Sequence, residues 1–115
     1  MIRLGAIALA AVALAATSGP APARLGVVAK EFHLILSRQS VKAGRVVVEL
    51  DNFGQDVHDL RLRRIGGSTT YSIAPTAAGA RAKLTARLRV GTYRLWCSIA
   101  DHRARGMVAT LRVRR

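Results

Sequence analysis

Apolar and polar residues alternate along much of the chain after residue 24, which is the spacing of a β-strand with one buried face. The clearest example is segment 81–90, in which apolar residues alternate with Arg, Lys and Thr. Segment 45–50 is rich in β-branched and apolar residues, a composition typical of a buried strand. We predict about seven strands, at residues 27–36, 45–50, 58–65, 69–73, 81–90, 92–97 and 107–113.

Turn-forming residues separate these segments. Residues 41–44, 51–56 and 66–67 contain Gly, with Asn and Asp in the second of them, and Gly91 marks another turn. The small-residue segment 75–79 is predicted to be a loop with room for a helical turn. Turn signals that recur about every 8–12 residues, with weak helical periodicity, predict an all-β fold, a Greek-key antiparallel β-sandwich.

The first 23 residues differ from the rest. A positive start at Arg3 precedes an uncharged apolar run of 13 residues, 4–16, which is too short to span a bilayer comfortably. Small residues follow at 21–23. This order is typical of a secretory signal peptide, so we predict a signal at 1–23, cleaved after Ala23, and one domain at 24–115. An uncleaved membrane anchor is the alternative. Cleavage would make the domain an exported protein, periplasmic or extracellular.

The remaining chain is strongly basic. Of the 19 Lys and Arg residues, 18 lie in 24–115 together with all six acidic residues, which gives a formal charge of +12. Such an excess favours an acidic protein partner or an anionic membrane surface. We expect no nucleic acid partner, because the arginines are scattered and an exported protein rarely meets one. Arginines that only solvate the strand faces are the simpler alternative.

The chain has one cysteine, whereas small exported domains usually pair their cysteines. Cys97 is therefore a free thiol, an intermolecular bridge or a metal ligand. It begins a Cys-x4-His-x4-Met segment with His102 and Met107, between two predicted strands. A thiolate, an imidazole and a thioether on one loop suit a soft or borderline metal, and two histidines, a cysteine and an axial methionine form the blue-copper arrangement. His58, which follows a turn, fits as the second histidine. His33, beside Glu31, is predicted to face solvent.

These segments together resemble the cupredoxin family, which includes plastocyanin, auracyanin, rusticyanin and azurin. The resemblance rests on four segments: Asn52-Phe53-Gly54, His58-Asp59-Leu60, residues 91–97, and the loop from Cys97 to Met107. It implies one type 1 copper ion with Cys97 as the strong sulfur ligand, His58 and His102 as nitrogen ligands, and Met107 as the long axial ligand.

The resemblance also assigns roles to neighbouring residues. It implies that His102 lies near the surface as the electron exit, that Trp96 lies on a second route, and that Tyr93 forms a tyrosine corner. The sequence departs from the family in two places. Ala100-Asp101 stands where Pro-Gly is frequent, and Asp59 stands where an Asn often helps to hold the ligand loops together.

We therefore predict a monomeric electron carrier that cycles Cu(II) and Cu(I). It would dock transiently with acidic redox partners around His102, through a rim made basic by Arg103 and Arg105. We expect no enzyme activity, because the sequence has no His-x-His pair and no Cys-x3-Cys loop. A periplasmic copper-delivery protein and a metal-free interaction domain are the alternatives.

Overall fold

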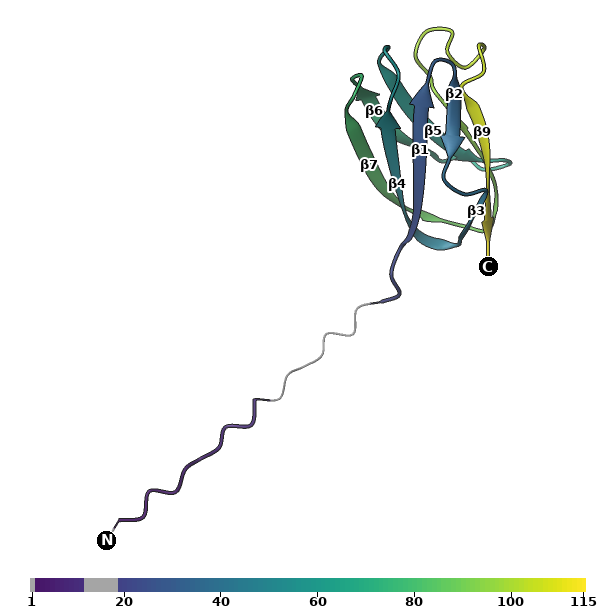
Figure 1. Ribbon diagram of the computed structural model, residues 1–115. Helices are drawn as coiled ribbons and strands as arrows, with labels where there is room; N and C mark the ends of the chain where they lie inside the picture. Colours follow the sequence, from purple (N-terminus) through teal and green to yellow (C-terminus); the bar gives the residue numbers. More distant parts are fainter. Residues whose placement is uncertain (1, 12–18) are drawn as a thin grey trace.

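A computed structural model describes residues 2–11 and 19–115 of the chain. The described residues form nine strands and no helix (Figure 1). The strands are β1 Ala23–Lys30, β2 His33–Leu36, β3 Ser40–Lys42, β4 Gly44–Asn52, β5 His58–Arg64, β6 Thr70–Thr76, β7 Arg81–Leu88, β8 Gly91–Trp96 and β9 Val108–Arg114. Residues 1 and 12–18 of the predicted signal lie outside the described part, so the signal stays a prediction.

Two sheets make up the sandwich, a four-stranded one in the order β2-β1-β4-β7 and a five-stranded one in the order β3-β9-β8-β5-β6. The predicted all-β sandwich is confirmed, but both sheets are mixed rather than antiparallel. β1 runs parallel to β4 and β3 runs parallel to β9. The reason is a crossover: between β1 and β4 the chain makes the hairpin with β2 and then joins the other sheet as β3, which lets it return in the direction of β1.

Three segments have a different structure from the one predicted. The predicted strand 27–36 is a hairpin of β1 and β2, in which Lys30 pairs with His33. The predicted turn at 41–44 includes β3, because Val41 pairs with β9. Strand β6 continues through Pro75, where we predicted a loop. Proline is tolerated there because β6 lies at the edge of its sheet, where a missing N–H breaks no inner ladder.

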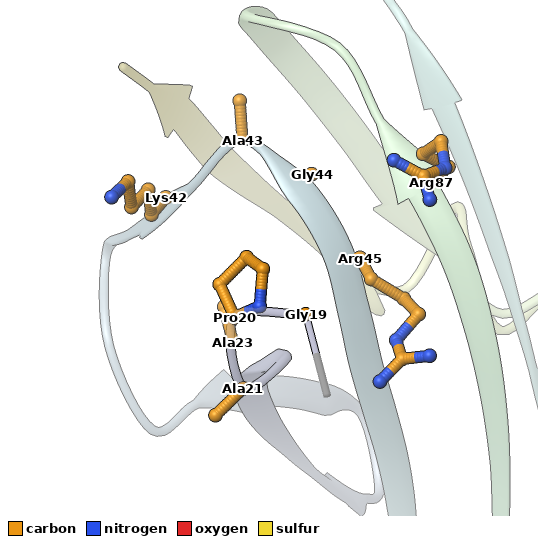
Figure 2. Close-up of a pocket in the computed structure, with 9 residues that line it drawn as sticks. All are labelled: Gly19, Pro20, Ala21, Ala23, Lys42, Ala43, Gly44, Arg45 and Arg87. Atoms are coloured by element: carbon orange, nitrogen blue, oxygen red, sulfur yellow. The ribbon is translucent and has the colours of Figure 1, made fainter. Parts of the chain in front are cut away.

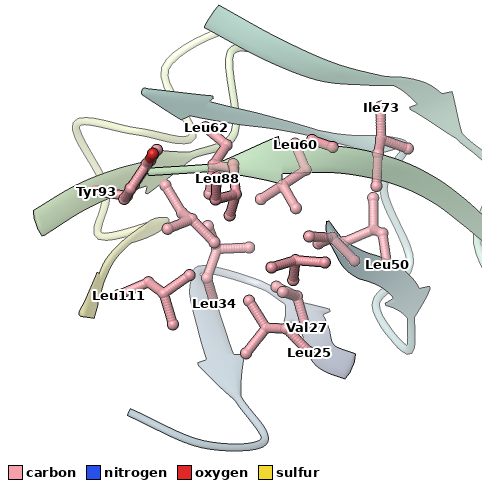
Figure 3. Packing of buried hydrophobic residues seen from close by; sticks show 14 of the residues in the cluster. Leu25, Val27, Leu34, Leu50, Leu60, Leu62, Ile73, Leu88, Tyr93 and Leu111 are labelled. Carbon is pink, nitrogen blue, oxygen red and sulfur yellow. The ribbon is translucent and has the colours of Figure 1, made fainter. Parts of the chain in front are cut away.

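Leucine and valine fill the space between the sheets (Figure 3). A fully buried Leu or Val side chain contributes roughly 1.5–3 kcal/mol relative to an exposed one. The core includes Leu25, Val27, Val46, Val48, Leu50, Leu60, Leu62, Leu88, Leu95, Leu111 and Val113. Tyr93 forms the predicted tyrosine corner: its hydroxyl accepts the N–H of Arg89 and donates to the carbonyl of Arg89, both at 3.0 Å. The core therefore fixes β8, the strand that leads to Cys97.

A hollow of about 400 Å³ lies where β4 begins, lined by Lys42, Arg45 and Arg87 and by residues 19–21 (Figure 2). Asn52, at the opposite end of β4, adjoins the loop that leads to His58. The hollow is thus separated from the predicted ligands by the length of a strand. The described residues contain no helix of the length and apolar character that a membrane crossing requires.

Candidate metal centre

Three of the predicted ligands meet at one end of the sandwich. His58 begins β5, Cys97 follows β8, and His102 lies in the loop that leads to β9. The Sγ atom of Cys97 lies 3.8 Å from Nδ1 of His58 and 3.6 Å from Nδ1 of His102, and the two Nδ1 atoms are 3.2 Å apart. His58 and Cys97 are fully buried and His102 is 6 % exposed. Among the described residues, this is the one group of three or more His, Cys, Asp or Glu side chains whose ligand atoms lie close enough to hold a metal ion, here within 4.8 Å of one another.

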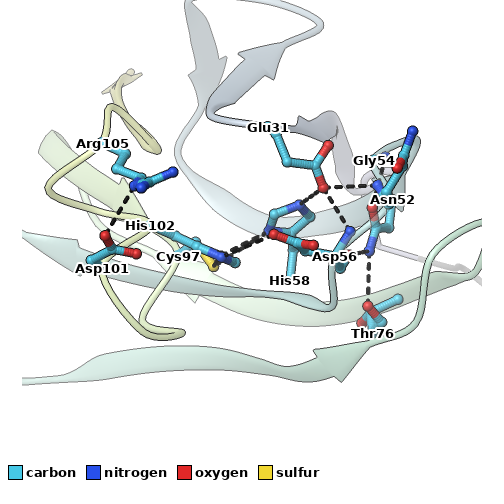
Figure 4. A network of polar contacts seen from close by, with 11 residues as sticks. Glu31, Asn52, Gly54, Asp56, His58, Thr76, Cys97, Asp101, His102 and Arg105 are labelled. Carbon is cyan, nitrogen blue, oxygen red and sulfur yellow. Dashed lines mark hydrogen bonds and ion pairs between the residues drawn. The ribbon is translucent and has the colours of Figure 1, made fainter.

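The opposite nitrogen of each histidine faces a carboxylate (Figure 4). Nε2 of His58 lies 3.1 Å from Oε1 of Glu31, and Nε2 of His102 lies 3.5 Å from Oδ2 of Asp56. An ionised carboxylate only accepts hydrogen bonds, so Glu31 favours the form of His58 with its proton on Nε2 and a lone pair on Nδ1. The two Nδ1 atoms and the cysteine sulfur therefore face one another in a buried space, which is an arrangement that a cation satisfies.

Glu31 is held firmly in the turn between β1 and β2. Its Oε1 accepts the backbone N–H groups of Gln55 and Asp56, each at 2.7 Å. Gly54 leaves the room for this carboxylate, because a Cβ there would lie 2.6 Å from both of its oxygens. The N–H of Asp56 first, and then the other backbone donors and His58, lower the pKa of Glu31 to about 2. Glu31 is thus ionised at neutral pH. Sequence reasoning missed this residue, because an acid in a turn looks like a solvated charge.

The loop from Cys97 to Met107 is closed at its base by strand pairing. Trp96 pairs with Val108, and the N–H of Cys97 donates to the carbonyl of Met107 at 3.1 Å. Met107 is fully buried, and its N–H donates to the carbonyl of His102 at 3.1 Å. Burial raises the pKa of the Cys97 thiol, so a metal that binds its thiolate must displace a proton.

Two further predicted residues tie this loop and the 52–58 loop to the sandwich. Asp59, buried next to His58, accepts the N–H of Ser98 at 2.6 Å and also the Ser98 hydroxyl. It thereby links the residue after one ligand to the residue after another, as expected for the Asn that it replaces. The side chain of Asn52 donates to the carbonyls of Asp56 and Thr76, at 2.8 and 2.9 Å. The histidine and cysteine segments are therefore linked by hydrogen bonds to the buried side chain of Asp59.

The surroundings of His102 are electrically mixed. Asp56 lies against its ring nitrogen, and the ring of Phe32 packs against its ring at 5.3 Å between centroids. Arg105 is paired with Asp101 at 2.9 Å and lies over Phe32. Arg103 lies over Trp96, on the outer face of the five-stranded sheet. The two arginines expected to make this rim basic thus have partners of their own, one of them away from His102.

No protein-family model matches the sequence, and no curated protein does. Solved structures do. Auracyanin A, a "blue" copper protein from the photosynthetic bacterium Chloroflexus aurantiacus, superposes with a TM-score of 0.66 at 15% identity, over 82% of this chain and 100% of its own. Reduced rusticyanin gives 0.67 at 16% identity, over 84% of this chain and 82% of its own. The chain has the cupredoxin fold. Part of a multicopper oxidase has a similar fold, with a TM-score of 0.63 at 15% identity; the match covers 84% of this chain and 45% of the oxidase chain.

The donors fit copper better than the other metals that proteins hold with imidazole. His58, Cys97 and His102 supply two imidazoles and a thiolate within 4.8 Å of one another, and Met107 ends the same loop. Zinc is also bound by imidazole and thiolate, but a thioether is a soft ligand that favours copper. The ligand set predicted from the sequence is therefore consistent with this cupredoxin site.

Proposed function

We propose that the protein is a small exported blue copper protein that carries single electrons between redox partners. His58, Cys97, His102 and Met107 would hold the ion. Bound there, copper supplies a one-electron Cu(II)/Cu(I) couple. The likeness to auracyanin and rusticyanin supports the same kind of role, although it establishes only the fold.

One observation carries the proposal: the donor atoms of His58, Cys97 and His102 lie within 4.8 Å of one another, and neighbouring residues hold them there. Glu31 accepts a hydrogen bond from His58, Asp56 lies 3.5 Å from Nε2 of His102, and Asp59 ties the residue after Cys97 to the residue after His58. A site fixed by neighbours that do not themselves bind the ion changes little when the ion changes charge. Small rearrangement is what rapid electron exchange requires, and it is not needed for copper delivery, which requires release.

The test is to add one equivalent of Cu(II) to the full chain and record the visible spectrum. We expect an intense thiolate-to-copper band that dithionite bleaches and air restores. Cys97→Ser should lose the band, and His58→Gln should lose or shift it, while His33→Gln, a change of the exposed histidine, should leave it unaltered. Circular dichroism of each variant checks that the fold is intact.

A pale protein would contradict the proposal, because the donors would then not assemble a copper–thiolate site. The copper-delivery alternative predicts a different result: a band or a Cu(I) complex from which a chelator removes the metal within seconds. Retention of copper through repeated cycles of reduction and oxidation, in the presence of that chelator, favours the carrier.

A further inference from the structure

The outer face of the five-stranded sheet holds a cluster of arginines around the only tryptophan of the chain. We define this arginine face by Arg61 and Arg63 of β5, Arg94 and Trp96 of β8, and Arg103 of the ligand loop. Arg61 pairs across the ladder with Trp96, and Arg63 pairs with Arg94, so the four side chains project from one side of the sheet. The guanidinium of Arg103 lies 4.7 Å from the centre of the Trp96 ring.

A hollow of about 530 Å³ opens on the arginine face. It lies between Trp96 and the turn 64–67, and Arg63, Arg94 and Arg103 line it as well. Arg63 is held in place because its Nε donates to a carbonyl of that turn at 2.9 Å. The hollow thus presents several guanidinium groups and an indole to whatever enters it.

Acidic side chains compensate little of this charge: among the described residues, one arginine of the face, Arg61, lies within 4 Å of a carboxylate. Five of the six acids lie elsewhere, namely Glu49 and Asp51 on β4 and Glu31, Asp56 and Asp101 around the ligand loops. The sixth, Asp59, is 2 % exposed, and its Oδ2 lies 3.7 Å from Nε of Arg61, so Arg63, Arg94 and Arg103 carry the uncompensated charge. Arg63 and Arg94 face each other directly, where like charges repel. An anionic group between them would relieve this repulsion.

We propose that the arginine face is the docking surface for an acidic protein, the redox partner of the carrier. That the partner is a redox protein rests on the proposed function; the binding itself does not. Guanidinium groups pair with carboxylates through two parallel hydrogen bonds, and Trp and Arg dominate the energy of protein interfaces. A hollow beside a projecting turn admits protruding side chains, whereas a bilayer surface is flat. Because Trp96 precedes Cys97, a partner bound to the arginine face contacts β8, the strand that leads to the Cys97 thiolate.

The test uses the fluorescence of Trp96, which reports on this face alone. The metal-free full chain is titrated with poly-L-glutamate at low ionic strength, and the fluorescence should change until it saturates. Removing two of the guanidinium groups in the double variant Arg63→Gln/Arg94→Gln should weaken binding about tenfold. The matched control is Arg45→Gln/Arg87→Gln, a pair that is also directly opposed across a ladder but in the other sheet; its affinity should stay within about twofold of the unaltered chain.

Three results would overturn the proposal. The first is a Trp96 fluorescence that does not change in a saturable way with poly-L-glutamate. The second is an equal loss of affinity in both double variants, which would mean that binding depends on the net charge of the protein and not on this face. The third is tighter binding of phosphatidylglycerol vesicles or of an oligothymidylate than of poly-L-glutamate, which would make the surface a membrane or nucleic acid site. The visible spectrum of the copper-loaded chain is recorded separately, so a failed copper site leaves the Trp96 binding curve readable.

Discussion

Replacing Glu31 by Gln should raise the reduction potential of the copper-loaded protein. The change keeps the shape of the side chain, and the amide oxygen can still accept the N–H groups of Gln55 and Asp56, which lie 2.7 Å from the present carboxylate oxygen. What is lost is the negative charge 3.1 Å from Nε2 of His58. With a neutral hydrogen-bond acceptor in place of the carboxylate, the imidazole of His58 donates less electron density to the metal. This weakens its bond to Cu(II) more than its bond to Cu(I).

The size of the shift follows from two quantities. Loss of a group that orients a metal-bound histidine typically weakens metal binding by about 10–100-fold. We take the lower end, because the backbone donors still hold the side chain in place. A tenfold loss for Cu(II) alone corresponds to a rise of about 59 mV for a one-electron couple.

Cyclic voltammetry measures this shift, and nitrogen NMR of the metal-free protein supplies an independent readout, since the Nε2–H form of His58 should become less populated. Gly54→Ala should act in the same direction, because the added Cβ would lie 2.6 Å from the Glu31 carboxylate and displace it. Glu49→Gln is the matched control, because it removes the same charge from β4, outside the ligand loops. The reasoning is refuted if Glu31→Gln and Glu49→Gln shift the potential equally, or if Glu31→Gln lowers it.

Three more variants probe the scaffold of the site. Asp59→Ala should destabilise the protein by roughly 1–3 kcal/mol, since it removes the charged acceptor of two hydrogen bonds from Ser98; urea unfolding measures this, and Asp59→Asn should lose clearly less. Ala100 has a positive φ of 45°, so Ala100→Gly should stabilise the fold by about 0.5–1 kcal/mol after the greater entropy of the unfolded chain is subtracted; an unchanged thermal midpoint would count against strain at this residue. In Tyr71→Phe the remaining tyrosine is Tyr93, whose pKa burial raises, so its phenolate absorbance should develop at higher pH than that of free tyrosine. The neutral Tyr93 hydroxyl therefore contributes stability that is complete below about pH 10 and is lost as the pH rises through the raised pKa of Tyr93. Ionisation of Tyr93 at the pH of free tyrosine would contradict this prediction.

The ligand loop could be predicted because its information is local. Cys97, His102 and Met107 lie within one segment, and Cys and Met are rare in this chain. The strand alternation then places both ends of the segment on neighbouring strands. The carboxylates that orient the histidines could not be predicted in this way. The contact of Glu31 with His58 depends on how the β1–β2 turn packs over the 52–58 loop, and the sequence contains no local signal for that packing.

The relative directions of the strands also could not be predicted from the alternation of apolar and polar residues. Alternation with a period of two is the same in parallel and antiparallel ladders, so β1 and β4 give no sign of running in the same direction. The deciding element is β3, whose three residues are too few to show a period. The end of β1 at Lys30, in contrast, coincides with a polar residue at a position where the alternation of segment 27–36 calls for an apolar one.

The pairing of β9 has a consequence for when the ligand loop takes its shape during synthesis and folding. This strand closes the base of the ligand loop through Val108 and pairs with β3 through Val113. It is also the last strand to be synthesised of those described. A nascent chain that already contains His58 and Cys97 therefore has the ligands without their spacing. The ligand loop therefore takes its final spacing only when β9 has paired with β8 and β3.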